Sequence, residues 1–175
     1  MAASADRCPH RGMRLSHGFV RGEALSCIYH GWTYSQAGQC LRIPAHPSLT
    51  PPETIRVATR LVEEAGGIIW VADGEPDGNP PLFEGYVPLR SLTARAGCSA
   101  LSVAAGTKAT VEGYVWQAPG APAIRLLPIP QEAGETLIHV LVPADCDASE
   151  RIAASRAAES LRRMAEGIEA KGAVP

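Results

Sequence analysis

The sequence predicts a mostly β, α+β protein, in which small antiparallel sheets are followed by a helix at the carboxyl end. Between residues 24 and 72, short apolar runs alternate with turn residues, and part of this stretch shows the period of two that strands require. In residues 148–170 the apolar residues recur with the helical period, and Asp147, directly before them, is a candidate capping residue. Between these parts, residues 73–81 (DGEPDGNPP) are dominated by turn-forming residues, which indicates a domain boundary.

Composition places the chain among globular proteins and excludes two classes of partner. The 175 residues are 46% hydrophobic and 19% charged, with 16 basic and 18 acidic side chains and a formal charge of −2. Because there is no basic excess, we expect no nucleic-acid binding. The apolar runs, such as residues 68–72, are much shorter than a membrane span, so we expect no membrane association.

The first residues and the cysteine count predict location and thiol chemistry. The opening run, MAASADR, has no apolar stretch of the kind that a secretory signal contains, so we expect a cytoplasmic protein. The five cysteines are an odd number, which disulfides alone cannot use. We therefore expect these side chains to be reduced thiols or metal ligands.

The predicted strands of the first part are short and are separated by turns that contain glycine and proline. They cover residues 24–28, 31–34, 40–43, 55–61 and 68–72. The last two form a hairpin, because residues 63–67 (EEAGG) turn the chain between them. We assign residues 1–74 to the first domain and residues 75–82 to a linker.

The second domain, residues 83–175, is predicted to be a small antiparallel sheet packed with one helix. Its candidate strands are residues 108–116, 123–127 and 135–142. The helix covers residues 148–170, with Asp147 and Glu150 as the first and last positions of a capping box and Gly172 as the stop. The apolar stripe predicted along this helix consists of Ile152, Ala157, Leu161, Met164 and Ile168.

Four candidate metal ligands lie in two short motifs near the amino end. Cys8 and His10 belong to the run CPHRG, and Cys27 and His30 belong to the run CIYHGW. Two thiolates and two imidazoles make a complete set of four ligands. A zinc site is one interpretation of this set. Its ligand pairs usually leave about two to four residues between them, however, and Cys8 and His10 leave only one.

The two motifs resemble the Rieske [2Fe–2S] pattern, Cys-x-His followed by Cys-x-x-His. The resemblance extends to residues 15–18 (LSHG), 29–32 (YHGW), 43–44 (IP) and the hairpin end at residues 67–71 (GIIWV). In these features the chain is similar to the Rieske domain of aromatic-ring-hydroxylating and O-demethylating oxygenases. The resemblance covers residues 6–74 and implies a Rieske-type antiparallel β domain. This domain would be followed by a sheet and a helix that resemble a helix-grip fold only in part.

The resemblance implies a role for each ligand. Cys8 and Cys27 would hold the buried ferric iron, and His10 and His30 would hold the outer, reducible iron. Electrons would then enter and leave through the two imidazoles. Respiratory Rieske proteins carry an additional disulfide and have a hydroxyl residue after the second His-Gly, where this chain has Trp32. We therefore expect a reduction potential at the low end of the Rieske range, about −150 mV.

The second iron site of these oxygenases is predicted to be missing, so no residue is assigned a catalytic role. That site is a mononuclear iron held by two histidines and one carboxylate. Only His139 lies in the second domain, because His17, His46 and the two ligand histidines lie in the first. The resemblance also implies strands before the first cysteine. Only seven residues precede Cys8, so we expect these strands to be missing from the sequence.

Three functions remain open. The first is an electron-transfer protein that accepts single electrons from a flavin or ferredoxin reductase and passes them to a mononuclear-iron oxygenase subunit. The second is a truncated Rieske non-haem iron oxygenase, of the aromatic-ring-hydroxylating or O-demethylating type, whose catalytic iron site is absent from this chain. The third is a non-redox binding module, in which the second domain holds an apolar ligand or a partner.

Overall fold

The structure, a computed structural model, describes residues 1–108 and 113–172 and divides into two compact units. The first unit consists of residues 1–65 and 69–80, and the second of residues 66–68 and 81–175. The domain limits taken from the sequence stay a prediction. In the described part of the chain, no helix combines the length and the hydropathy that a membrane crossing requires.

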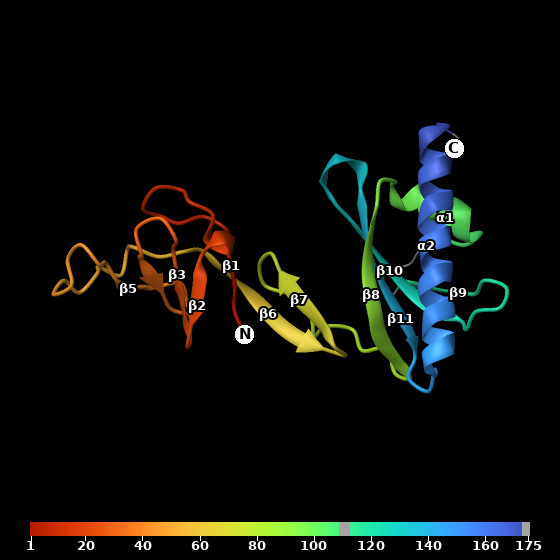
Figure 1. Cartoon of the computed structure of the whole chain (residues 1–175), viewed down its shortest axis with the longest axis horizontal. Coiled ribbons are helices and arrows are strands. Elements are labelled where there is room, and N and C mark those ends of the chain that lie inside the picture. Colours follow the sequence, from red (N-terminus) through yellow and green to blue (C-terminus); the bar gives the residue numbers. More distant parts are fainter. Residues whose placement is uncertain (109–112, 173–175) are drawn as a thin grey trace. The chain divides into compact units, whose positions relative to one another are not determined.

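Two small antiparallel sheets form the first unit (Figure 1), with the strand orders β2-β3-β4-β5 and β1-β6-β7. The strands are β1 (Ala3–Ser4), β2 (Phe19–Arg21), β3 (Ala24–Ser26), β4 (Thr33–Tyr34), β5 (Cys40–Arg42), β6 (Thr59–Ala65) and β7 (Ile68–Ala72). A 3-10 turn, η1 (Leu15–His17), precedes β2. The hairpin turn is tighter than predicted. Strand β6 continues to Ala65, and Gly66 and Gly67, both with positive φ, turn the chain.

The hydrophobic core of the first unit is small. Its buried residues are Cys8, Leu15, Cys27, Tyr34, Cys40, Ile43 and Val57. Three of them are cysteines, and two of these cysteines are predicted cluster ligands. Apolar burial scales with the area removed from water, so this core contributes little stability by itself.

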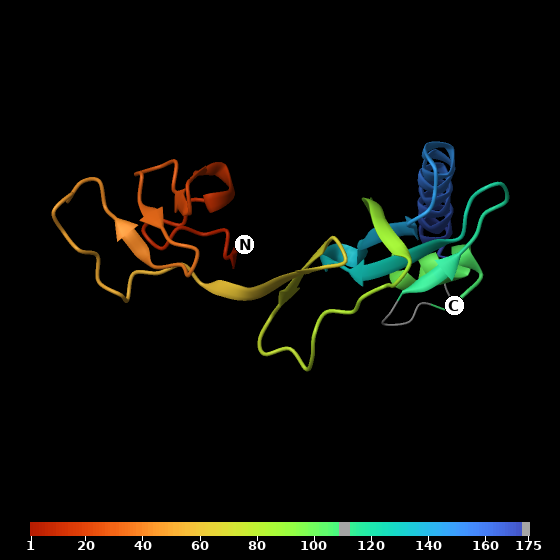
Figure 2. The same ribbon diagram turned by 90° about the horizontal axis from the view of Figure 1, so that it is seen from below.

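The second unit is one antiparallel sheet with two helices, in the strand order β8-β11-β10-β9. Its elements are β8 (Tyr86–Ala94), α1 (Cys98–Ala105), β9 (Tyr114–Trp116), β10 (Ile124–Pro130), η2 (Glu132–Gly134), β11 (Thr136–Pro143) and α2 (Ala148–Ala170). Helix α2 lies against one face of the sheet (Figure 2), and α1 contacts both α2 and β10. The predicted fold class, mostly β with a carboxyl-terminal helix, is confirmed.

Helix α2 has the bounds that the sequence predicts, Ala148–Ala170, and begins with the predicted capping box. The carboxylate of Asp147 accepts a hydrogen bond from the amide of Glu150 at 2.9 Å. The carboxylate of Glu150 accepts one in return from the amide of Asp147, also at 2.9 Å. These two bonds satisfy donors that a helix start leaves without partners.

The apolar stripe predicted for α2 is wrong in part. Ile152 is 53% exposed and Met164 is 46% exposed. The buried residues of the helix are instead Ala154, Ala157, Ala158, Leu161 and Ala165. Leu161 is nine positions after Ile152, and a rotation of roughly 100° per residue places the two on opposite sides of the helix.

The sequence analysis assigns no element to residues 83–107, where the structure has β8 and α1. Pro88 interrupts the pattern of β8, but β8 is an edge strand and its register with β11 shifts beside that position. Helix α1 starts without a side-chain cap, at Gly97. Of the strand predicted over residues 108–116, the structure shows Tyr114–Trp116, and residues 109–112 lie outside the described residues.

Candidate metal centre

Two loops of the first unit share one pattern of backbone hydrogen bonds. In each loop, the amide of the cysteine donates to the carbonyl five residues on, and the amide four residues on donates to the carbonyl of the cysteine. In the first loop, Cys8 N to Met13 O and Gly12 N to Cys8 O both measure 2.8 Å. In the second, Cys27 N to Trp32 O is 2.9 Å and Gly31 N to Cys27 O is 3.0 Å. The loops are therefore equivalent supports for one cysteine and one histidine each.

Both loops need glycine at the position four residues after the cysteine. Gly12 has a φ of 71° and Gly31 a φ of 67°, in the left-handed region that glycine adopts without steric penalty. A Cβ atom placed on Gly31 would also lie 3.1 Å from Cγ of Pro44. The glycines in CPHRG and YHGW are thus explained by the turns that present the neighbouring histidines.

Asp6 ties the first loop to the rest of the unit. Its carboxylate accepts hydrogen bonds from the amide of Ser16 at 2.6 Å and from the Ser16 hydroxyl at 2.8 Å. These bonds hold the pKa of Asp6 below its ordinary value, so the carboxylate stays ionised at neutral pH. The loop that carries Cys8 and His10 is therefore anchored at η1 as well as by its own turn.

The two cysteines of the motifs are buried beside a tyrosine. Cys8 is 2% exposed and Cys27 is 3% exposed. The hydroxyl of Tyr34, which is itself 1% exposed, lies 3.0 Å from Sγ of Cys8. Burial, the hydrogen bond with Cys8 and the nearby thiols raise the pKa of Tyr34 well above its ordinary value. A phenol that stays protonated is available to donate a hydrogen bond to a thiolate.

The two histidines lie together at the surface. Their ring centroids are 4.7 Å apart, His10 is partly buried and His30 is exposed. The indole of Trp32 stacks on His10 at 4.4 Å, and the ring of Tyr29 lies 3.8 Å from that of His30. Burial first, and then the charges of His30 and Arg11, lower the pKa of His10. This shift favours the neutral imidazole, which is the form that binds metal.

A third buried cysteine, Cys40, belongs to the same core and is not one of the predicted ligands. It pairs with Tyr34 in the register of β4 and β5, and its thiol lies 3.8 Å from the carbonyl of Arg42. Burial raises the pKa of Cys40, which favours the neutral thiol. It therefore behaves as a small apolar residue of the core.

The ligand set fits a [2Fe–2S] cluster better than a single metal ion. Among the described residues, no three His, Cys, Asp or Glu side chains are gathered closely enough to hold one ion. A structural zinc ion needs about four such ligands around it. In a Rieske cluster each iron takes about two protein ligands. Two buried thiols and two neighbouring imidazoles, presented by paired loops, satisfy that requirement.

The other histidines lie outside the two ligand loops or in the second unit. His17 ends η1 and His46 follows β5, and both are exposed. His139 is in β11, with Nδ1 at 2.7 Å from the hydroxyl of Ser91. Burial lowers the pKa of His139. Within the described residues, none of these three belongs to a second group of metal ligands.

Sequence reasoning missed Tyr34 as a functional residue and placed it only in a strand. Two signals could have found it. Tyr34 follows the second motif directly, in YHGWTY, and a strand turns alternate residues to the same side. A polar aromatic residue on the buried side of that strand requires a hydrogen-bond partner, and the cysteine thiols are the polar groups of this core.

Comparison with known proteins agrees with this site. Residues 1–59 match the Rieske [2Fe-2S] domain family. Oxidoreductase NdmD of Pseudomonas putida is 50% identical over 76 residues, which are 43% of this chain and 13% of NdmD. The 4beta-methylsterol monooxygenase of Methylococcus capsulatus is 42% identical over 97 residues, which are 49% of this chain and 26% of that enzyme. The chain thus spans only a minor part of these relatives.

Solved structures extend the similarity of fold to the second unit. The NdmA of Pseudomonas putida CBB5 with caffeine has a TM-score of 0.68 at 20% identity, and covers 94% of this chain and 70% of its own. Dicamba monooxygenase bound to dicamba has a TM-score of 0.71 at 19% identity, and covers 98% of this chain and 77% of its own. At such identities the likeness is one of fold.

The class of protein follows from the paired loops and the family match. Residues 1–59 are a Rieske [2Fe–2S] domain, similar in sequence to parts of an oxidoreductase and of oxygenases, and the cofactor of this domain is a Rieske-type [2Fe–2S] cluster. The sequence prediction of family and cofactor is confirmed. The assignment of Cys8, His10, Cys27 and His30 as the individual ligands stays a prediction.

Proposed function

We propose that this chain transfers single electrons from a reductase towards a mononuclear-iron oxygenase centre, through a cluster held by Cys8, His10, Cys27 and His30. One observation carries the proposal: two imidazoles, 4.7 Å apart, lie at the surface, while the two thiols of the same loops are buried. An arrangement of this kind places the electron-accepting end of a Rieske cluster within reach of partner proteins.

The bound cluster would supply one-electron oxidation and reduction at this site. The protein's own residues would hold the irons, exchange the coupled proton and stabilise the reduced state. His10 and His30 would hold the outer iron and expose their second ring nitrogens, where a proton can be taken up or released. The hydroxyl of Tyr34, 3.0 Å from Sγ of Cys8, would donate to the thiolate and stabilise the more negative state. The ring of Trp32 shields one face of His10 from water.

The proposed donor is a flavin or ferredoxin reductase, and the proposed acceptor is an oxygenase subunit. The similarity to oxidoreductase NdmD and to several oxygenases supports this pair of partners. The oxygen-activating iron, which two histidines and one carboxylate would hold, is proposed to belong to the acceptor subunit. A cytoplasmic location, where such reductases work with soluble cofactors, is part of the proposal.

A second candidate is a shortened oxygenase, of the aromatic-ring-hydroxylating or O-demethylating type. The observation that favours it is the extent of the fold similarity, which reaches 94% and 98% of this chain in two oxygenase structures and includes the second unit. In this case the second unit would be the remaining part of a catalytic domain. An in-frame Rieske start upstream in the genomic DNA would distinguish this candidate from the first.

The test is stopped-flow spectroscopy on the anaerobically purified protein. An NADH-dependent flavin reductase should bleach the visible absorption of the cluster, and addition of an oxidised Rieske oxygenase should restore it. The variant Cys27→Ser is the control, because it should show neither change. A cluster that assembles but is neither reduced nor reoxidised by any such protein would contradict the electron-transfer function.

A further inference from the structure

Charge is distributed unevenly along this chain. Residues 7–52 contain five arginines and a single carboxylate, Glu23, a formal charge of +4. The rest of the chain has eleven basic and seventeen acidic side chains, a formal charge of −6. The segment that carries the two ligand motifs is therefore a local cationic region in a protein of net charge −2. Its five arginines are Arg7, Arg11, Arg14, Arg21 and Arg42.

The register of the strands divides these arginines between two ends of the sheet. Arg42 pairs with Thr33, the residue after Trp32, so it lies at the end of β5 beside the second ligand loop. Arg21 pairs with Ala24 and lies at the opposite end of the β2–β3 hairpin, by the turn. Phe19, which pairs with Ser26 next to Cys27, marks the ligand-loop end of that hairpin.

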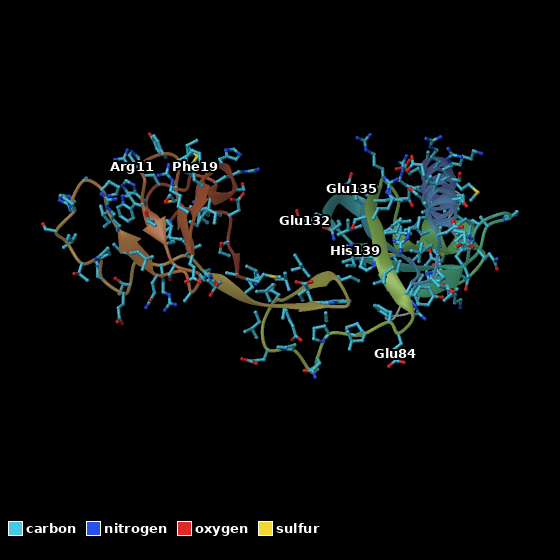
Figure 3. All side chains as sticks on the ribbon, turned by 60° about the horizontal axis from the view of Figure 1, so that its bottom comes forward. Arg11, Phe19, Glu84, Glu132, Glu135 and His139 are labelled. Carbon is cyan, nitrogen blue, oxygen red and sulfur yellow. The ribbon has the colours of Figure 1, made fainter. Side chains whose placement is uncertain are left out.

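Three more arginines belong to the first ligand loop and the start of η1. Arg11 directly follows His10, and Arg14 directly precedes η1. The guanidinium of Arg7 lies beside Gly12, with Nε 3.5 Å from the position of a Cβ on that glycine. Figure 3 shows Arg11 and Phe19 at the same end of the first unit.

These cations are exposed, and Arg14 is close enough to the ionised carboxylate of Asp6 to help lower its pKa. All five arginines are exposed, and none takes part in an ion pair within the described part of the chain. Apolar side chains accompany them: Ile28 is 50% exposed and Tyr29 is 53% exposed, beside the exposed His30. An apolar centre with a charged rim is the usual composition of a transient protein interface.

We propose that Arg7, Arg11, Arg14 and Arg42, together with the exposed Ile28 and Tyr29 beside His30, form a docking surface for an acidic electron-transfer protein. We call this surface the arginine face. The partner would present carboxylates around its own exposed redox centre, so that opposite charges bring the two centres together. The proposal rests on the proposed function. One electron leaves the reduced partner, which is oxidised, and reduces the [2Fe–2S] cluster of this chain.

The competing occupant of the arginine face is a second copy of the chain. Residues 61–89 contain six carboxylates and no basic residue, so this acidic segment of one copy could bind the arginine face of another. The position of the cations favours the redox partner. The four arginines of the arginine face lie on or next to the loops of His10 and His30, where proximity of a donor shortens the electron path. Electrostatic steering to that point raises the rate of productive encounters, and salt reduces it.

The experiment is stopped-flow reduction of the oxidised protein by a reduced plant-type [2Fe–2S] ferredoxin, which is an acidic protein, at low and high salt. We expect the second-order rate constant to fall about tenfold or more as the salt concentration rises from about 20 to 300 mM. The double variant Arg11→Gln, Arg42→Gln should be about tenfold slower at low salt and nearly independent of salt. Arg21→Gln, at the far end of the hairpin, is the matched control and should behave as the unmodified protein.

A second measurement uses small oxidants of opposite charge on the dithionite-reduced protein. Reoxidation by ferricyanide, an anion, should slow in the double variant. Reoxidation by the tris(phenanthroline)cobalt(III) cation should become faster in the same variant. Unchanged iron, sulfide and EPR signal in the variants would show that the cluster site is intact, so that the changes report local charge.

The outcomes separate this inference from the proposed function. The rate constant for reduction by ferredoxin could be independent of salt and unchanged by the double substitution, in a protein that dithionite reduces normally. That result would overturn the arginine face but would not contradict the electron-transfer function. A salt-sensitive dimer in sedimentation, lost in the double variant, would assign the surface to a second copy and also overturn the proposal. A cluster that dithionite does not reduce would instead contradict the electron-transfer function itself.

Discussion

The two units of the chain are stabilised by different interactions. Among the described residues, the core of the first unit has seven buried side chains, three of them cysteines. The core of the second unit has fifteen, nearly all aliphatic, supplied by the sheet and both helices. The first unit is therefore expected to depend on its metal cluster for stability, and the second on apolar burial.

This difference shows where stability and function are placed in the molecule. The second unit has a continuous apolar core that needs no cofactor, and it contains none of the four predicted ligands. In the first unit, buried cysteines occupy core positions that are aliphatic in other small domains. The cluster is expected to supply the stability that this small apolar core does not. Loss of the cluster should therefore leave the second unit folded, and a weakened apolar core in the second unit should leave the cluster in place.

The largest expected effect is the loss of the cluster from the variant Cys27→Ser. The serine hydroxyl is a poor ligand for iron, and metal binding and folding are coupled, so the first unit should lose its iron and its ordered loops. Iron analysis and EPR measure the first change, and circular dichroism should show that helix α2 remains. Cys40→Ser, a buried cysteine in the same core, is the control and should keep its iron. Equal iron loss from both variants would contradict the ligand assignment.

The converse change is Leu161→Ala in α2. Leu161 is 1% exposed, and truncation of such a side chain costs about 2–5 kcal/mol of unfolding free energy. We expect denaturant unfolding of the helix to shift by that amount, while the EPR signal of the cluster is unchanged. Ile152→Ala, on the exposed side of the same helix, should change the unfolding free energy by less than about 0.5 kcal/mol. A loss of the cluster together with the helix would mean that the units are not independent.

A smaller effect is expected at the cluster itself from Tyr34→Phe. The substitution removes the hydroxyl that lies 3.0 Å from Sγ of Cys8, and with it the donor proposed to stabilise the reduced state. A net hydrogen bond of about 1 kcal/mol corresponds to a fall in the one-electron potential on the order of 50 mV. Protein-film voltammetry measures this fall. Tyr29→Phe is the matched control, because the ring of Tyr29 contacts that of His30 at a tilt and its hydroxyl makes no hydrogen bond within the described residues. A potential that Tyr34→Phe leaves unchanged would rule out this role.

The smallest expected effect is a pH dependence confined to α2. Hydrogen bonds from Arg162 and Arg163 lower the pKa of Glu159 from 4.5 to about 2. A carboxylate whose pKa is lowered by folding adds stability above its unfolded pKa, and that stability is lost as the pH falls through the folded value. Helix unfolding should therefore become slightly easier between about pH 4.5 and pH 2, and less so in Glu159→Gln. Identical pH profiles for the two proteins would show that the ion pairs contribute nothing.

The sequence predicted the features that local patterns determine. The fold class and the bounds of α2 are confirmed, because strand alternation, turn residues and a capping box are local signals. It missed β8, which Pro88 interrupts, because the neighbouring strand β11 supplies the pairing that makes a strand there. It missed the hydrogen bond of Tyr34 and the stacking of Trp32 on His10 for the same reason, since both join residues of separate segments. Which cysteines and histidines are ligands was predicted from the resemblance of the two motifs to the Rieske pattern, and stays a prediction.

The most direct test of this account is the iron and acid-labile sulfide content of the anaerobically purified protein, with an EPR spectrum after dithionite. The account predicts about two irons and two sulfides per chain and a Rieske-type signal, held by Cys8, His10, Cys27 and His30. A third iron would make the chain an oxygenase in its own right. Bound zinc, or no metal, would contradict the cluster and with it the proposed transfer of electrons.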